Sequence, residues 1–226
     1  MIAYSGRLIL HESLYFATRE VGRLYETGRY LHNYALTYAL GLAVAPYFHA
    51  EQVPRYAEQL APLNERGVYV TPARGVRVEY VLATFKYANN AYHVEMEKGS
   101  RNTPSFGRAK ELAVGSEFEF AVLSQRETLR LPRWVRLGLW RSKAAIVWET
   151  AEAKPDKAKQ ERASLPLNPL DTSGALLAFD LISMPPSSLV DHALLQAEWW
   201  AWQCEGEAHR LPAGMKYTFP NKKGPA

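Results

Sequence analysis

Apolar and polar residues alternate along several stretches of the chain, a pattern typical of strands that bury one face. In residues 2–10, Ile2, Tyr4 and Leu8 fall on one side and Arg7 on the other. The opening segment is therefore predicted to be a half-buried strand. Similar arguments predict strands at residues 116–124 and 133–149, and a buried strand at residues 174–183.

A second pattern, with apolar residues every three to four positions, predicts helices. The first lies between Thr27, a suitable N-cap, and Gly41 just beyond its end. A shorter helix is predicted in residues 53–67, ended by Pro62. The third is predicted over residues 187–206, where serine residues precede an apolar run.

Between these elements the pattern predicts an arm, a loop and a connection. Residues 76–98 alternate around an asparagine-rich turn, so we expect a hairpin that projects from the body. Residues 99–110 are polar and basic and predict a loop. Residues 151–164 carry charges of both signs without periodicity, which indicates an exposed, mobile connection. The fold class is α+β with a mostly antiparallel sheet, in a single domain over residues 1–226.

Composition narrows the class of protein. With 47% hydrophobic and 22% charged residues, the chain resembles ordinary soluble globular proteins. The single cysteine, Cys204, cannot form an internal disulfide and fits a reducing compartment. Arg7 and His11 interrupt the N-terminal apolar stretch, and residues 34–48 are too short to span a bilayer. We therefore expect a cytoplasmic protein with no membrane role.

Charge is distributed unevenly along the chain. The net charge is +4, but residues 99–143 hold nine Lys or Arg against four Glu, so this segment carries +5 and the remainder −1. A basic segment of this kind is typical of proteins that bind a polyanion, although it can also serve solubility alone.

Within that segment, residues 131–150 combine three tryptophans with cations and contain no acidic residue before Lys143. Read as one strand, the stretch buries Val135, Leu137, Leu139, Ala145 and Val147 and exposes the alternate positions. Cations neutralise phosphates and indole rings stack on bases, so the mixture favours single-stranded nucleic acid over a duplex. In this reading Trp140 faces a ligand, Trp134 and Trp148 can equally be core residues, and Gly138 leaves room for a backbone or ribose.

Other kinds of site lack support in the sequence. No two of the six histidines have the spacing of a helical metal pair, and no nucleotide-binding or hydrolase motif occurs, so no metal or cofactor is expected. A metal-independent ribonuclease remains an alternative, because His32, a helix tyrosine and Lys143 could supply acid, base and cation. The competing interpretation is that Tyr30, Tyr34 and Tyr38 form a core stripe.

Two stretches, "LYETGRYLHNYALTYALGL" at residues 24–42 and "LPRWVRLGLWRSKA" at residues 131–144, resemble the Cas5-type (Csc1) small subunit of type I-D CRISPR surveillance complexes. The resemblance implies a ferredoxin-like, RRM-like antiparallel sheet of the RAMP superfamily, with helices on one face and a protruding β-hairpin thumb near residues 76–98. It also implies a protein that is not an enzyme. One departure from the family pattern is Leu139, where a basic residue often follows the glycine.

The resemblance further implies partners and binding residues. Such a subunit caps the 5′ handle of the CRISPR RNA, contacts the large subunit and the first backbone subunit, and lies near the protospacer-adjacent motif of target DNA. Some relatives in another subtype cleave precursor RNA, which keeps the ribonuclease alternative open. The implied RNA-binding residues are Arg101, Asn102, Arg108, Lys110, Arg133, Arg136, Trp140, Arg141 and Lys143.

Overall fold

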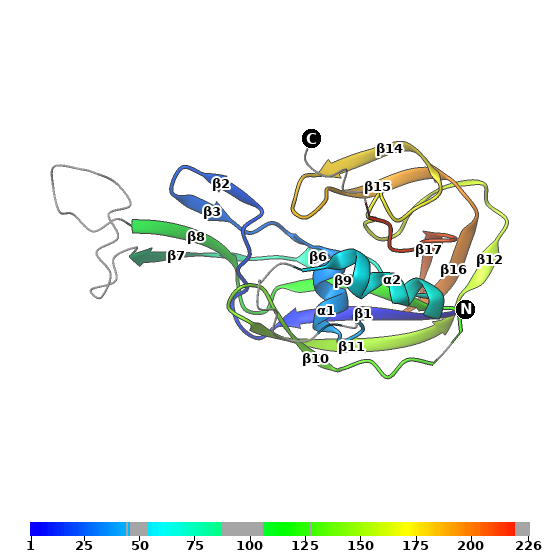
Figure 1. Ribbon diagram of the computed structural model, residues 1–226, viewed down its shortest axis with the longest axis horizontal. Helices are drawn as coiled ribbons and strands as arrows, with labels where there is room; N and C mark the ends of the chain where they lie inside the picture. Colours follow the sequence, from blue (N-terminus) through cyan, green and yellow to red (C-terminus); the bar gives the residue numbers. More distant parts are fainter. Residues whose placement is uncertain (44, 46–53, 87–105, 127, 220–226) are drawn as a thin grey trace.

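Strands dominate the computed structural model, which describes residues 1–43, 45, 54–86, 106–126 and 128–219 (Figure 1). In these ranges, seventeen strands form four sheets and two short helices accompany them. The predicted mixture of strands and helices is therefore correct, but the share of strand is larger than expected. No helix in the described ranges is both long and apolar enough to cross a membrane.

The largest sheet has seven strands in the order β10-β11-β1-β9-β6-β4, with β5 paired to β9, and every pairing is antiparallel. The strands are β1 (Ile2–Leu10), β4 (Tyr30–Leu31), β5 (Val68–Val70), β6 (Ala73–Arg77), β9 (Glu117–Ser124), β10 (Trp134–Leu137) and β11 (Ser142–Glu152). The strands predicted at residues 2–10 and 116–124 are β1 and β9, and both are confirmed.

Two helices contact this sheet, α1 (Asn33–Ala39) and α2 (Tyr56–Arg66). The N-cap of α1 is His32 rather than Thr27, because residues 30–31 first pair with β6 as β4. Pro62 lies inside α2 rather than at its end, and the helix stops at Gly67 in the left-handed conformation. Leu60 and Leu63, on either side of the proline, are fully buried and anchor α2 in the core.

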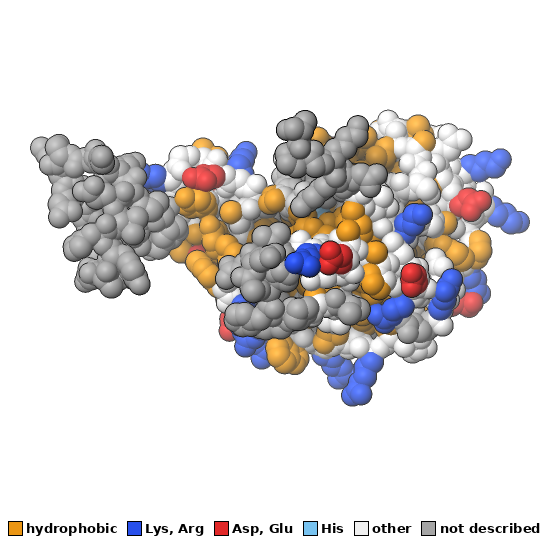
Figure 2. Space-filling view, viewed as in Figure 1, with side chains coloured by type: hydrophobic (Ala, Val, Ile, Leu, Met, Phe, Trp, Pro, Cys, Tyr) orange, Lys and Arg blue, Asp and Glu red, His pale blue; other side chains and the backbone are white. Residues whose placement is uncertain are grey.

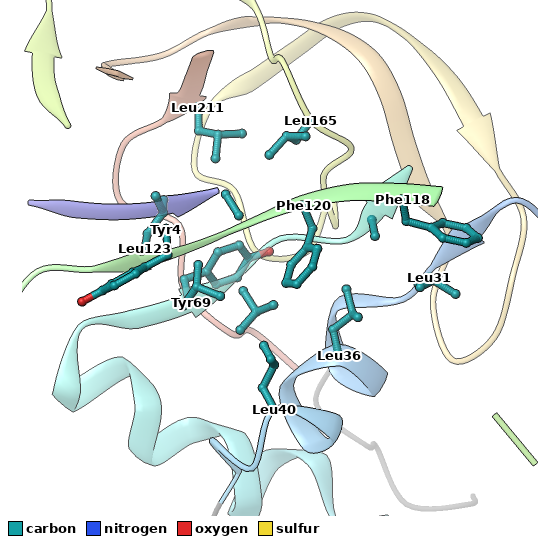
Figure 3. Packing of buried hydrophobic residues seen from close by; sticks show 14 of the residues in the cluster. Tyr4, Leu31, Leu36, Leu40, Tyr69, Phe118, Phe120, Leu123, Leu165 and Leu211 are labelled. Carbon is teal, nitrogen blue, oxygen red and sulfur yellow. The ribbon is translucent and has the colours of Figure 1, made fainter. Parts of the chain in front are cut away.

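The hydrophobic core lies on both sides of the seven-stranded sheet. Figure 3 shows Leu36 and Leu40 of α1 on one side of β9, and Leu165 and Leu211 on the other. We call the side facing α1 the inner face and the opposite side the outer face. C-terminal strands cover one end of the outer face, where Trp202 donates a hydrogen bond of 3.0 Å to Ser5 Oγ. The other end of the outer face stays open.

The C-terminal third differs most from the prediction. Residues 187–206 do not form a helix but two strands, β15 (Leu189–Gln196) and β16 (Trp199–Cys204), which belong to different sheets. The connection predicted at 151–164 contains β12 (Lys154–Asp156) and β13 (Gln160–Arg162). These strands form two three-stranded sheets, β12-β16-β17 and β13-β15-β14, completed by β17 (Glu207–Pro212) and β14 (Ala175–Ile182).

Strand β14 was predicted to be buried, and this is wrong. It is the outermost strand of its sheet, and Leu177, Phe179 and Leu181 all face solvent. An apolar run cannot by itself distinguish a central strand from an edge strand that carries apolar residues outward.

An arm of four strands projects from the body (Figure 1). Its order is β2-β3-β8-β7, with bounds β2 (Arg19–Val21), β3 (Leu24–Glu26), β7 (Tyr80–Lys86) and β8 (Phe106–Leu112). The first limb of the predicted hairpin is thus a strand, but its partner is β8, which begins inside the predicted basic loop. The predicted second limb, at residues 92–98, lies outside the described residues.

Candidate nucleic-acid interface

The tryptophan-rich stretch forms a hairpin rather than one strand. Strands β10 and β11 pair in register, with Trp134 opposite Ala145 and Arg136 opposite Lys143. Val135 and Leu137 are buried as predicted, but the turn changes the alternation: Leu139 is 70% exposed, Val147 is 56% exposed and Ser142 is buried. Ala145, predicted to share the buried face of Val135, is half-buried and lies on the opposite face with Trp134. Gly138, with φ of +72°, begins this reversal. The single-strand register is therefore wrong beyond Leu137.

The turn of the hairpin docks on the segment that follows β1. A Cβ added to Gly138 would lie 2.5 Å from Leu14 Cδ1 and 2.6 Å from the Tyr15 carbonyl oxygen. The Leu139 N–H donates to that oxygen at 3.0 Å, and Ser142 Oγ donates to the Ser13 carbonyl oxygen at 2.6 Å. The space at Gly138 is therefore filled by the protein's own backbone rather than by a ligand.

The three tryptophans have different environments. Trp148 lies on the inner face, where its Nε1 donates to the Pro132 carbonyl oxygen at 2.7 Å and its ring packs on Phe120. Trp140, in the turn, is 53% exposed and its ring centroid lies 4.9 Å from that of Tyr15. Trp134 lies on the outer face and is 56% exposed. Of the two tryptophans suggested as core residues, Trp148 is half-buried and packs against the core, whereas Trp134 is exposed.

Cations gather on this hairpin, and Figure 2 shows blue side chains along the lower rim of the body. The exposed members of the group are Arg130, Arg133, Arg136, Arg141 and Lys143. The acidic residue beside them is Glu12, which accepts from the Lys143 backbone N–H at 2.7 Å and lies 4.0 Å from Arg136 Nη1. Neither Arg133 nor Lys143 forms an ion pair with any described residue. The hairpin therefore carries a local excess of positive charge.

Elsewhere on the outer face, the described arginines Arg7, Arg74 and Arg77 are paired with carboxylates. Arg7 and Arg77 both contact Glu117, and Arg74 contacts Glu119 and the buried Asp191. Hydrogen bonding to Glu117 raises the pKa of Arg7. Because these cations are neutralised within the sheet, the positive excess of the outer face is confined to the β10–β11 hairpin.

The arm holds the other candidate cations. Arg108 lies on β8 and is exposed, and Lys110 lies 4.3 Å above the Tyr80 ring and 3.8 Å from Glu26. Both residues are thus on a strand rather than in the predicted loop. Arg101 and Asn102 lie outside the described residues.

Of the residues named for the ribonuclease alternative, His32 and the helix tyrosines lie in or against the core, whereas Lys143 is exposed. His32 is buried, its Nδ1 accepts from the Tyr34 N–H at 3.2 Å, and its Nε2 lies 3.0 Å from Ser187 Oγ. Burial lowers the pKa of His32 to about 4 and raises the pKa of Tyr34 and Tyr38 to about 12. Tyr34 is buried and Tyr38 half-buried, as the core-stripe interpretation requires, whereas Tyr30 belongs to β4.

The remaining histidines give no metal site in the described residues. His11 and His192 are exposed and His209 is half-buried, while His49 and His93 lie outside the described ranges. Within those ranges, no three His, Cys, Asp or Glu side chains are close enough to hold an ion.

The sequence reasoning missed an apolar groove beside the turn. It has a volume of about 460 Å³ and is formed by the segment Leu14–Ala17, the first turns of α1, and the loop Met184–Pro186. Leu137 and Gly138 form its edge on the hairpin side. No single stretch of sequence signals this groove, because segments that lie far apart in the chain build it.

Comparison with known proteins decides the family. The model of the family described as type I-D CRISPR-associated protein Cas5/Csc1 matches residues 1–220. The chain belongs to this family. The expected resemblance is therefore confirmed, and this Cas5/Csc1 chain is a component of a type I-D CRISPR system.

Two solved structures are also similar to this chain. One is a chain in the cryo-EM structure of the type III-B Cmr-beta complex bound to cognate target RNA and AMPPnP, with 9% identity, 85% of this chain and 86% of that chain covered, and a TM-score of 0.45. Another is a CRISPR protein from Archaeoglobus fulgidus, with 12% identity, coverage of 94% and 100%, and a TM-score of 0.47. The Cas5/Csc1 chain matches no curated protein.

Proposed function

We propose that this protein is a non-catalytic RNA-binding subunit of a type I-D CRISPR effector complex in the prokaryotic cytoplasm. It caps the 5′ handle of the CRISPR RNA and contacts the large subunit and the first backbone subunit, near the protospacer-adjacent motif of target DNA. The observation that carries the proposal is the cluster of exposed cations and indole rings on the β10–β11 hairpin.

The chemistry of the hairpin supports single-stranded RNA as the ligand. Arg133, Arg136 and Lys143 can neutralise phosphates, which supplies affinity without reading sequence. Exposed indole rings accept unpaired bases, whereas the bases of a duplex are already stacked. On this proposal the seven-stranded sheet is the ferredoxin-like body and the β7–β8 pair is the thumb that reaches toward the guide.

The test compares cation deletions on the hairpin with one elsewhere. Arg136→Ala and Lys143→Ala lower the retention of CRISPR RNA by the assembled complex and leave the melting temperature nearly unchanged, because both side chains face solvent. Lys154→Ala removes an exposed lysine from β12 and serves as the control. Equal RNA retention by all three variants contradicts the proposal. Unfolding of either hairpin variant shows instead that the residue is structural.

We further propose that the protein does not cut RNA, because both ring nitrogens of His32 already have partners and its low pKa makes it a weak base. Incubation of the purified protein with repeat RNA in EDTA tests this. Cleavage that persists in EDTA supports the metal-independent ribonuclease instead.

A further inference from the structure

We propose that Trp134 is the platform on which one unpaired RNA base stacks, on an apolar shelf of the outer face formed by Trp134, Ala145 and Ile9. The inference rests on the proposed RNA-binding function and extends it. It assigns the base contact to a residue that the sequence interpretation treated as a candidate for the core.

The shelf follows from the register of three adjacent strands. Trp134 of β10 lies opposite Ala145 of β11, and Ala145 lies opposite Ile9 of β1. Residues directly opposite one another in antiparallel strands project from the same face. The row therefore runs from the large ring at the sheet edge, across a small residue, to a half-buried aliphatic side chain. Ala145 is too small to cover the indole.

The ring of Trp134 is free to stack on a base, whereas the rings of Trp140 and Trp148 pack against other side chains. Trp148 is fixed by its hydrogen bond to Pro132 and by Phe120, and Trp140 rests against Tyr15. Within the described residues, the interaction found for Trp134 is with the Lys143 ammonium, 5.8 Å from the ring centroid. A ring this exposed at a sheet edge leaves a large apolar surface in water, which a stacked base would cover.

Cations occupy the next row of the same face. Arg136 and Lys143 lie opposite each other, two residues along their strands from Trp134 and Ala145. Two residues of a strand span about 6.6 Å, so one nucleotide can place its base on the ring and a phosphate between the two cations. Base stacking and phosphate binding are thus combined within a single pair of strands.

The charge around the shelf favours RNA over a protein partner. Arg133 precedes the ring in sequence, and Arg136 and Lys143 border it. The nearby described acidic side chains are Glu12, beside Arg136, and Glu117, which lies opposite Ile9 and is already paired with Arg7 and Arg77. Burying such cations against an apolar protein surface would cost their hydration, whereas phosphates compensate them. The paired arginines on the rest of the outer face offer no comparable attraction.

The experiment uses the full chain and a short unstructured single-stranded RNA that carries 2-aminopurine, whose fluorescence is quenched on stacking. Removing an aromatic side chain that stacks on one base lowers RNA affinity by about 5- to 150-fold, and we expect this loss for Trp134→Ala. Trp134→Phe keeps an aromatic ring and should retain most of the affinity. Phe179→Ala removes an exposed ring from β14 and is the matched control, with affinity unchanged.

The dependence of affinity on salt separates stacking from charge. Trp134→Ala keeps the slope of log affinity against log salt, whereas Lys143→Ala reduces its magnitude by about 0.7, the value for one phosphate contact on a single strand. The 2-aminopurine signal is quenched by the wild type and by Trp134→Phe but not by Trp134→Ala.

Failure of this inference is distinct from failure of the proposed function. If the wild type binds no RNA, either free or in the assembled complex, the RNA-binding function itself falls. If the wild type binds and quenches, and Trp134→Ala does so equally, the stacking platform is elsewhere and the inference is overturned. If Trp134→Ala keeps RNA affinity but loses the neighbouring subunits, the shelf binds protein, which also overturns it.

Discussion

Gly138 illustrates how one residue determines the shape of the hairpin. Its φ of +72° is disfavoured for residues with a side chain, and a Cβ there would collide with Leu14 and the Tyr15 carbonyl. Gly22 has a similar φ of +61°, but a Cβ there meets nothing within 4 Å. A substitution at Gly22 therefore carries only the energetic cost of the backbone conformation, whereas one at Gly138 adds the cost of the collision.

We expect Gly138→Ala to reduce the free energy of unfolding by about 1–3 kcal/mol more than Gly22→Ala, because the turn must move away from the segment after β1. Urea unfolding of the two variants measures the difference. Equal losses would mean that the turn shifts without resistance, and the tight docking described above would be wrong.

Asp171 provides a second prediction at the scale of the residue. Its carboxylate is 2% exposed and accepts hydrogen bonds from Asn33, Tyr69 and the backbone N–H of Thr218. Burial outweighs these bonds and raises the pKa of Asp171 from 3.8 to about 6. Between these values the folded state keeps a proton that the unfolded state has released, so the contribution of this group to stability falls as pH rises.

Measurement of the free energy of unfolding from about pH 4 to pH 7 tests this, since each unit of pKa shift corresponds to about 1.4 kcal/mol. The wild type should lose stability relative to Asp171→Asn as pH rises toward 6, and the difference should be constant above that. Parallel pH profiles for the two proteins would show that Asp171 has an ordinary pKa in the fold.

The burial or exposure of individual residues was predicted best within short, regular strands, where alternation alone assigns each side chain to a face. Arg136 and Val135 fall on the expected sides because β10 is short and regular. The sequence does not decide whether Trp134 lies in the core or faces a ligand, because composition does not show where in a sheet a ring lies. His32 was named as a possible base, but its role as a buried N-cap depends on contacts with Ser187, 155 residues away in the chain.

Among the elements, the alternating strands β1 and β9 were predicted correctly, whereas the β10–β11 turn and the strands β15 and β16 were not. Leu189, Val190 and Asp191 are all buried in β15, so the period of two that would reveal a strand is lost. The backbone of His192, with φ of +50°, breaks the register further. Strand β12 was not predicted, because its charged residues give no apolar alternation. Asp156 accepts a hydrogen bond from Arg210 Nε at 2.7 Å, and this partner lies far away in the sequence.

The arm gives a prediction at the scale of the element. Strand β7 is the outermost strand of the arm sheet, and its Val81 and Leu82 are 42% and 54% exposed. With few buried contacts, its amides should exchange with solvent faster than those of β9, whose Phe118 and Phe120 lie in the core. Hydrogen exchange on the free protein and on the assembled complex measures this, and assembly should slow β7 specifically.

Equal exchange of β7 and β9 in the free protein would contradict the description of the arm as a weakly held projection. An arm that is no better protected after assembly would show that neither RNA nor a neighbouring subunit binds along β7. The second outcome would leave the hairpin site intact, because β10 and β11 belong to the other sheet.

At the scale of the molecule, the basic segment seen in the sequence is divided between two places. Arg108 and Lys110 lie on the arm, and the remaining described candidates lie on the β10–β11 hairpin. The segment after β1 joins them, because Leu14 bridges to Leu112 at the end of β8 while Tyr15 binds the hairpin turn. The sequence predicted the charge correctly but not this division, which depends on how three segments meet.

The division leads to a final prediction, that one RNA strand crosses both groups of cations. A short RNA that covers the hairpin alone should show a slope of log affinity against log salt near −2, for about three phosphates at ~0.7 each. An RNA long enough to reach the arm should show a steeper slope, and Arg108→Ala should reduce that slope for the long RNA only. Lys143→Ala should reduce it for both, because the hairpin is occupied in each case. If Arg108→Ala changes the slope equally for the two lengths, or for neither, the arm and the hairpin do not bind a common strand, and the cations of the arm serve another partner.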